Sequence, residues 1–160
     1  MISQENVKII RETAEELFSR MTFPVLDINI EIPGEQDLKV DKDVVNLYIN
    51  IQEPKFLIGQ NGQTLVEIER ILRVILNKKL QKSFYLKLDI NDYHKQKVEY
   101  LKNLAKDSAD EVALTKKEKI LPPMSSYERR IVHMELDGRQ DINTESRGDS
   151  LDRHIIILPK

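Results

Sequence analysis

The sequence has no cysteine and no tryptophan among its 160 residues. Without cysteine, disulfide bonds, thiolate metal ligands and cysteine nucleophiles are excluded. Its apolar runs are far shorter than the ~18 residues that a membrane-spanning helix needs. Met1 to Arg11 carries charges where a signal peptide has its apolar segment. The sequence therefore predicts a cytoplasmic protein without a membrane span.

A strong overall charge is also missing, because the formal net charge is only −2 at pH 7. This total argues against tight nonspecific binding to duplex nucleic acid, which rests on many phosphate contacts. The charges are unevenly distributed, however. Residues 1–54 hold five Lys and Arg against eleven Asp and Glu, whereas residues 55–87 hold seven against two. We therefore expect a positive field centred on the loop that holds Gly59 and Gly62 and on the helix that follows it, which bears on partners and not on fold.

Hydrophobic residues make up 40% of the chain, enough to bury a core, and their spacing alternates between helix and strand periods. Over the first 90 residues we expect helices at 3–20, 55–58 and 63–80, and strands at 25–32, 44–51 and 83–90. The second and third strands flank a helical crossover, which predicts parallel neighbours. Pro33 and Gly34 mark a turn before an acidic loop at 35–43. The helix at 63–80 is expected to bury Leu65, Ile68, Leu72, Ile75 and Leu76, supported by Ile71.

Gly59 and Gly62 stand three residues apart, directly before the helix expected at 63–80. Glycines can take positive φ and let another backbone approach closely. The amides of residues 62–64 would then lie at a helix N-terminus, which suits a phosphate. No Lys-Ser/Thr pair follows Gly62 and no third glycine is present, so neither a Walker A loop nor a dinucleotide fingerprint fits. The pattern predicts a clamp for a single-stranded sugar–phosphate backbone, and the alternative is a plain structural turn.

In this context residues 3–90 resemble a KH domain of type II, which has its extra helix and strand at the N-terminal end. The resemblance implies that the backbone clamp lies on Gly59, Gln60, Asn61 and Gly62. Many KH loops carry Lys or Arg between the glycines, whereas Gln60 and Asn61 are neutral amides that attract phosphate less at long range. The expected RNA-binding set in this half is Lys55, Ile58, Gly59, Gln60, Asn61, Gly62, Arg70 and Arg73.

The second half begins where Asn91 and Asp92 break the strand pattern. We expect a helix at 93–117, a short extended piece at 120–121, a helix at 126–136 and strands at 142–146 and 154–158. The Ser125-x-x-Glu128 pattern predicts a capping box. Arg129 and His133 are four residues apart and share one helix face. Thr144, Ser146, Arg147, Gly148 and Arg153 follow, and such hydroxyls and guanidinium groups suit phosphate.

The Arg-x-x-x-His spacing, the run from Leu121 to His133 and the segments 144–148 and 153–159 resemble the R-three-H domain of the bacterial Jag (KhpB) family. That family joins a KH domain to an R-three-H domain in this order. The resemblance implies that single-stranded nucleic acid is bound by Arg129, Arg130, His133, Thr144, Ser146 and Arg153. Family members typically have a further N-terminal domain, which we expect this chain to lack. The alternative here is a capped helix with a salt-bridged Arg and a hydrogen-bonded His.

Catalysis, metals and cofactors find no support in the pattern. No nucleophile elbow is present, and the three histidines are scattered without a His-x-x-x-His pair. His94 near a helix start and His154 in a terminal strand are best interpreted as structural. We therefore expect no enzyme activity, no metal and no cofactor.

The sequence thus predicts an α+β protein with a KH domain at 1–91 and an R-three-H domain at 92–160. The expected function is binding of single-stranded RNA, with single-stranded DNA left open, in a post-transcriptional or cell-envelope and division regulator. The preference for RNA follows only from the family resemblance. The alternative is a protein-interaction adaptor, because KH surfaces can dimerise with a small KH protein or with a second copy. The acidic residues of 1–54 could also pair with a basic partner.

Overall fold

A computed structural model describes residues 2–33 and 43–160 of the chain. The chain divides into two compact units, residues 1–93 (unit 1) and residues 94–160 (unit 2). The predicted turn at 33–34 and the acidic loop at 35–43 fall almost wholly outside the described residues. No helix in the described part of the chain is long and apolar enough to cross a membrane.

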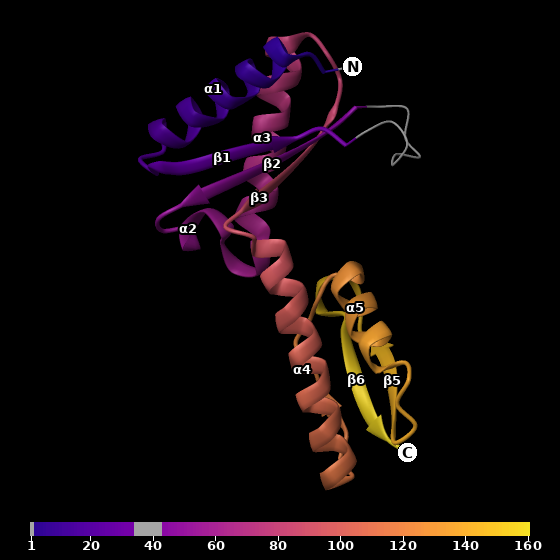
Figure 1. The fold of residues 1–160 in the computed structure, drawn as a ribbon. Coiled ribbons are helices and arrows are strands. Elements are labelled where there is room, and N and C mark those ends of the chain that lie inside the picture. Colours follow the sequence, from indigo (N-terminus) through magenta and orange to yellow (C-terminus); the bar gives the residue numbers. More distant parts are fainter. Residues whose placement is uncertain (1, 34–42) are drawn as a thin grey trace. The chain divides into compact units, whose positions relative to one another are not determined.

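Within the described residues, unit 1 contains three strands and two main helices (Figure 1). Its elements are α1 (Gln4–Arg20), β1 (Val25–Glu31), β2 (Val44–Ile51), α2 (Lys55–Ile58), a 3-10 turn (Gln60–Gly62), α3 (Gln63–Leu80) and β3 (Tyr85–Ile90). The sheet order is β1-β2-β3, with β1 antiparallel and β3 parallel to β2. The predicted order of elements and the parallel pairing are therefore present, because a helical crossover returns the chain beside β2.

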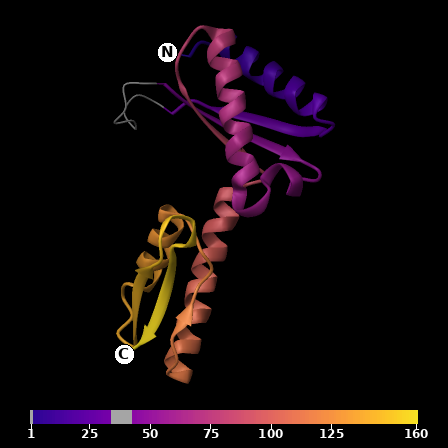
Figure 2. The same cartoon turned by 180° about the vertical axis from the view of Figure 1, so that it is seen from behind.

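The N-terminal helix forms where the sequence predicts it. Ser3 caps α1: its Oγ accepts from the Asn6 amide at 3.2 Å, and the Asn6 side chain accepts from the Ser3 amide at 3.0 Å. The helical spacing then buries Ile10, Ala14 and Phe18. Helices α1 and α3 pack on the same face of the sheet (Figure 2) and enclose one core with it. In the described part of unit 1, no helix lies on the other face of the sheet (Figure 1).

The predicted buried stripe of α3 is wrong at two positions. Ile71 is 54% exposed and Ile75 is 37% exposed. The other members of the predicted stripe are buried: Leu65, Ile68, Leu72 and Leu76. Ile71 directly precedes the buried Leu72, and one residue turns a helix by about 100°. A three-stranded sheet covers only one side of the helix, so Ile71 and Ile75 face solvent.

Unit 2 is also α+β. Its elements are α4 (Tyr93–Thr115, whose first residue belongs to unit 1), β4 (Lys119–Ile120), α5 (Ser126–Leu136), β5 (Ile142–Arg147), a 3-10 turn (Ser150–Asp152) and β6 (His154–Pro159). The antiparallel sheet has the order β4-β6-β5. The predicted capping box is confirmed, because the Ser125 Oγ accepts from the Glu128 amide at 3.3 Å and Glu128 accepts from the Ser125 amide at 2.7 Å. The core is formed by Leu101, Ala105, Ala109, Val112, Leu121, Val132, Leu136, Ile142, Ile155 and Ile157.

Candidate nucleic-acid interface

The backbone conformation and packing of the glycine loop in unit 1 require glycine at both positions. Gly59 has φ of +70° and Gly62 has φ of +81°, conformations that side chains rarely adopt. A Cβ on Gly59 would overlap the Thr64 hydroxyl, and a Cβ on Gly62 would lie 2.7 Å from the Tyr93 ring. The expectation that the missing side chains leave space for a partner's backbone is therefore wrong on this side, because Thr64 and Tyr93 fill that space.

The loop also uses some of the amides that were expected to meet a phosphate. The Gly62 amide donates to the Gly59 carbonyl at 3.4 Å, and the Gln63 amide donates to the Gln60 carbonyl. These bonds close the 3-10 turn that leads into α3. The groups that the loop presents to solvent are instead the exposed side chains of Gln60, Asn61 and Thr64.

The remaining predicted residues of unit 1 are only partly gathered at this loop. Lys55 is exposed on α2, and Ile58 and Arg73 are half-buried. Arg70 is exposed but pairs with Glu67 at 3.2 Å, so part of its charge is compensated. Phe56, which the sequence reasoning did not select, is 71% exposed beside Lys55. The available signal in the sequence was a helix of only four residues between Pro54 and Gly59. This short helix leaves one of its apolar residues, Phe56, exposed.

The positive field of residues 55–87 is spread along α3 and is not centred on the glycine loop. Lys78 and Lys79 lie in the last turn of α3. At a rise of ~1.5 Å per residue, Lys79 is about 24 Å from the start of the helix. Its ammonium donates to the Thr13 hydroxyl of α1 at 3.1 Å. The charge asymmetry in the sequence therefore overstates the attraction at the loop.

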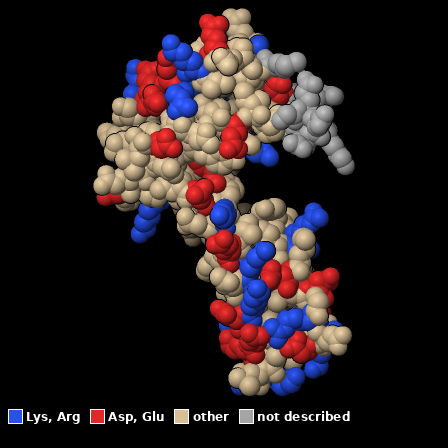
Figure 3. All heavy atoms as spheres, viewed as in Figure 1, with Lys and Arg blue, Asp and Glu red and all other residues tan. Residues whose placement is uncertain are grey.

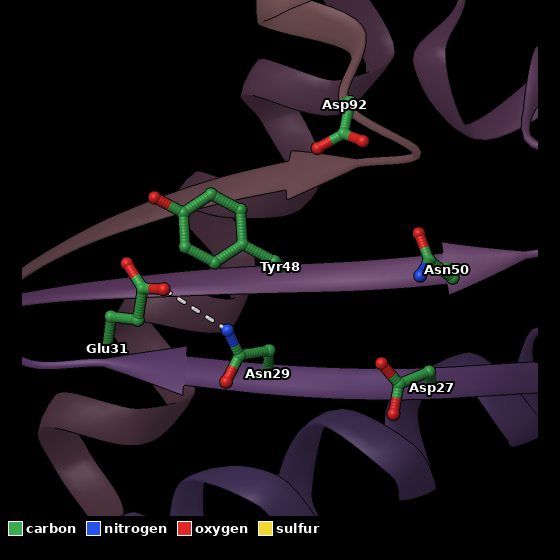
Figure 4. Close-up of a pocket in the computed structure, with 6 residues that line it drawn as sticks. All are labelled: Asp27, Asn29, Glu31, Tyr48, Asn50 and Asp92. Carbon is green, nitrogen blue, oxygen red and sulfur yellow. Dashed lines mark hydrogen bonds between the residues drawn. The ribbon is translucent and has the colours of Figure 1, made fainter.

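The open face of the unit 1 sheet is acidic. Asp27, Asn29, Glu31, Tyr48, Asn50 and Asp92 line a shallow hollow of about 330 Å³ (Figure 4). Asn29 donates to Glu31 at 3.2 Å. Burial raises the pKa of the Tyr48 phenol, and the carboxylates of Glu31, Asp89 and Asp92 raise it further. A face with this charge repels a polyanion.

In unit 2 the predicted residues meet on one side of the sheet. Thr144 and Ser146 alternate along β5 and pair with the core residues Ile157 and Ile155 of β6, so both hydroxyls lie on the helix-facing side. There the Thr144 hydroxyl and His133 Nδ1 of α5 share a hydrogen bond of 2.8 Å.

The two arginines of this cluster are held by neutral acceptors. Arg153 donates from Nε to the Ser146 hydroxyl at 3.1 Å. Arg129 donates to the Met124 carbonyl at 2.7 Å and to the Ser126 hydroxyl at 3.0 Å. The Met124 amide in turn donates to the Arg153 carbonyl at 3.1 Å. We call this set, Arg129, His133, Thr144, Ser146 and Arg153, the Arg–His cluster.

The bonding of the arginines decides how much charge each one offers. Arg147 pairs with Glu145 at 2.7 Å, and Arg139 pairs with Asp141 at 2.6 Å and also with Asp110. Arg129 and Arg153 make no such ion pair within the described residues, so their charges stay uncompensated. Over unit 2, the face drawn in Figure 3 mixes both signs. The Arg–His cluster therefore stands out by its bonding and not by a large basic patch.

The surroundings of His133 favour the neutral form of its ring. Burial lowers the pKa of its imidazole, and the nearby Arg129 charge lowers it further. The ring thus serves as a directional hydrogen-bonding group fixed by Thr144. Arg130 is exposed next to the cluster. Tyr127 and Met134, which the sequence reasoning missed, are 66% and 68% exposed, three residues before and four residues after Arg130 on the same side of α5.

Comparison with known proteins adds family relationships. The R-three-H domain family matches residues 99–159, which lie within unit 2. The "RNA-binding protein KhpB" of Clostridium symbiosum is 34% identical over 149 residues, covering 93% of this chain and 64% of that protein. The protein of the same name from Bacillus subtilis (strain 168) is 35% identical over 133 residues, covering 81% of this chain and 64% of that protein.

A third relative of that name, from Streptococcus pneumoniae serotype 2, is 25% identical over 148 residues, which cover 92% of this chain and 44% of that protein. The chain thus spans 64% or less of the length of these three curated relatives. The similarity extends over most of this chain and includes both of its units. Most of this chain is therefore similar to proteins of the Jag/KhpB kind, and its second unit matches the R-three-H domain family.

Proposed function

We propose that this chain is a noncatalytic cytoplasmic protein that binds single-stranded RNA through one face on each unit. In this proposal residues 1–91 form a KH domain of type II and residues 92–160 form the R-three-H domain. The observation that carries it is the Arg–His cluster, in which neutral acceptors hold two uncompensated guanidinium groups and one of these, Arg129, lies near a histidine whose neutral form is favoured. The match to the R-three-H family and the names of the relatives support RNA as the ligand.

In unit 2 the cluster binds phosphates with groups that are already oriented. Arg129 and Arg153 supply charge and planar donors, and the hydroxyls of Thr144 and Ser146 add directional bonds. Because hydrogen bonds already hold these side chains, little rotamer freedom is lost on binding. Exposed Tyr127 and Met134 offer apolar surfaces on which unpaired bases can stack. Such stacking favours single strands over duplexes.

In unit 1 the contact is the exposed edge of the glycine loop. Gln60 and Asn61 hydrogen-bond phosphate oxygens, Ile58 supports the turn, and Lys55, Arg70 and Arg73 add moderate attraction. Phe56 is placed to stack on a base. The support is the helix-strand-strand-helix-helix-strand order with its parallel β2–β3 pair, together with the acidic open face that turns RNA toward the loop.

The test is a titration of labelled single-stranded RNA with the wild type and a double variant, Arg129→Gln plus Arg153→Gln. Glutamine is shorter than arginine but stays polar, keeps an amide donor and removes the charge. We expect affinity to fall by at least about tenfold and the salt slope of log K to fall by about 1.4, since two phosphate contacts are lost. Circular dichroism checks that both proteins are folded.

The matched control is Arg147→Gln, because Arg147 lies on the other side of the same strand and is already paired with Glu145. We expect its affinity to change by less than about twofold. Single-stranded DNA and duplex RNA of the same sequence measure strand preference. Wild-type protein that shows no salt-dependent binding to single strands contradicts the proposal.

We further propose that the chain acts as a bacterial post-transcriptional or cell-envelope and division regulator. Crosslinking in cells followed by sequencing of the bound strands tests this role, and recovery of no RNA above an Arg129→Gln plus Arg153→Gln control contradicts it. A protein-interaction surface is the second candidate function. The exposed apolar residues of α3 favour it.

A further inference from the structure

The face of the unit 1 sheet that lies opposite α1 and α3 carries mostly acidic and amide side chains, and we call it the acidic face. Successive side chains of a strand point to opposite faces, so its members alternate with the core residues of the three strands. They are Asp27, Asn29, Glu31, Asn46, Tyr48, Asn50, Tyr85, Lys87 and Asp89. With Asp92, which follows β3 and lines the same hollow, the face holds four carboxylates against one lysine.

Three of these carboxylates are available to a partner. Asp27, Glu31 and Asp92 are exposed and make no ion pair within the described residues. Glu31 accepts one hydrogen bond from the neutral Asn29 side chain at 3.2 Å. Their negative charges are therefore compensated only by solvent and salt, and a cationic partner gains from all three.

An aromatic ring lies among these charges. Tyr48 is half-buried at the hollow, and Figure 4 draws its ring between Glu31 and Asp92. Burial raises the pKa of the Tyr48 phenol, and the carboxylates of Glu31, Asp89 and Asp92 raise it further, so the ring lies in a region of negative potential. A planar guanidinium group suits this arrangement, because it can stack on the ring while its N–H groups donate to the carboxylates.

The spacing of the carboxylates suits several cations better than one. No group of three or more His, Asp or Glu side chains in the described residues is placed to hold a single metal ion. Asp27 and Glu31 stand four residues apart on β1, which corresponds to about 13 Å. In an extended chain with a basic residue at every second position, the cations lie on one side at steps of about 6.6 Å. Every second cation of such a chain therefore matches the distance between the two carboxylates.

The outer edge of β1 does not favour the addition of a further strand. The Ile49 carbonyl accepts from the Asn91 amide, so Ile49 bonds toward β3, and its neighbour Ile28 on β1 directs its own carbonyl outward. Arg11 of α1 donates to that Ile28 carbonyl at 2.7 Å. Because an acceptor at the edge is already used, a bound segment is expected to lie across the acidic face and not to extend the sheet.

We propose that the acidic face of unit 1 binds an extended, arginine-rich segment of a partner protein. Guanidinium groups of the segment bind the carboxylates of Asp27, Glu31 and Asp92, and one of them stacks on the Tyr48 ring. RNA does not compete for this face, because the same charges repel a polyanion. The binding is therefore independent of the proposed RNA contacts.

The test is a fluorescence anisotropy titration of the full chain, without RNA and at low salt, with a labelled peptide of about twelve residues in which Arg and Thr alternate. We expect binding that weakens as salt rises. Asp27→Asn plus Glu31→Gln removes two charges with little change of shape, and we expect it to weaken binding by at least about fivefold.

The matched control is Glu12→Gln plus Glu15→Gln, which removes the same number of charges from exposed positions of α1 on the opposite side of the sheet. We expect this control to change the affinity for the peptide by less than about twofold. Circular dichroism confirms that all variants are folded.

A second peptide, in which Lys replaces every Arg, tests the contact with the ring. We expect the arginine peptide to bind about threefold more tightly, because lysine lacks the planar group that stacks. Tyr48→Leu should abolish this preference. Tyr85→Leu is its control, because Tyr85 is an exposed tyrosine of the same sheet that does not line the hollow, and the preference should remain in this variant.

Three results overturn the proposal: a wild type that shows no salt-dependent binding of the arginine peptide, an equal loss of affinity in the α1 control, and a preference for arginine that survives Tyr48→Leu. A single-stranded RNA affinity that falls with Asp27→Asn plus Glu31→Gln would assign the face to RNA and also contradict it. Because the peptide is titrated without RNA, failure of this test leaves the proposed RNA binding untouched.

Discussion

The two proposed RNA-binding faces prepare their polar groups in opposite ways. In unit 1 the amides of Gly62 and Gln63 donate to carbonyls within the glycine loop itself, and the loop offers only neutral side chains at its exposed edge. In unit 2 regular elements carry the Arg–His cluster, whose side chains hold one another while two cations remain uncompensated. We therefore expect unit 2 to supply most of the electrostatic affinity for RNA and unit 1 to contribute mainly through shape.

The largest expected effect is a loss of stability of unit 1 when a side chain is added at Gly62. Gly62→Ala combines φ of +81° with a Cβ 2.7 Å from the Tyr93 ring, and we expect it to lower the free energy of unfolding of unit 1 by about 2 kcal/mol or more. The control is Gly138→Ala in unit 2, where a Cβ meets nothing within 4 Å. Urea unfolding compares the two, and equal stabilities would contradict the structural role of Gly62.

A smaller effect measures how much the glycine loop contributes to affinity. Gln60→Glu plus Asn61→Asp keeps the shapes of both exposed side chains and adds two negative charges. We expect RNA affinity to fall about fivefold, less than for the double substitution in the Arg–His cluster, because the loop binds without fixed cations. The measurement is the same RNA titration. An unchanged affinity would remove the loop from the binding surface, and a loss larger than that of the cluster would reverse the comparison.

The smallest expected effect is a pH dependence of the stability of unit 2. The pKa of His133 is lowered in the folded chain, so the unfolded chain binds protons first as the pH falls. The stability that depends on neutral His133 is therefore complete above about pH 6.5 and decreases as the pH falls toward the folded-state pKa. The expected loss between about pH 7.5 and pH 5.5 is below about 1 kcal/mol, because the site is solvent-screened.

His133→Gln keeps a hydrogen-bonding group beside Thr144 but cannot titrate. Urea unfolding of the variant should show a weaker dependence on pH over this range than the wild type. Any contribution from His94 and His154 is shared by the two proteins and cancels in the comparison. Identical pH dependence in both proteins would show that His133 titrates alike in the folded and unfolded chain.

Local signals in the sequence were sufficient for much of the secondary structure. The capping boxes at Ser3 and Ser125, Pro54 before α2 and the glycines before α3 act within a few residues, so the helices begin where expected. The exposure of Ile71 could not be predicted, because periodicity identifies apolar positions but not which neighbours are available to cover them. Ile71 and Ile75 were therefore interpreted as core.

The site was predicted as a set of residues but not as an arrangement. The motif placed Arg129 and His133 on one face of α5, whereas the contact of His133 with Thr144 depends on how β5 and β6 pair. Of the suggested structural alternative, the capped helix and the hydrogen-bonded His133 are present. The salt-bridged Arg is not, because the partners of Arg129 are the neutral Met124 carbonyl and Ser126 hydroxyl. Charge counts along the sequence likewise could not show that the α3 lysines lie far from the loop.

Tyr93 has two roles that the covalent chain ties together. Its ring occupies the space beside Gly62, and its backbone is the last of unit 1 and the first of α4. The point at which unit 2 is attached is therefore also the support under the loop. A variant in which a flexible linker replaces this junction must therefore keep the Tyr93 ring. Without the ring, the change would alter the glycine loop of unit 1 as well as the attachment of unit 2.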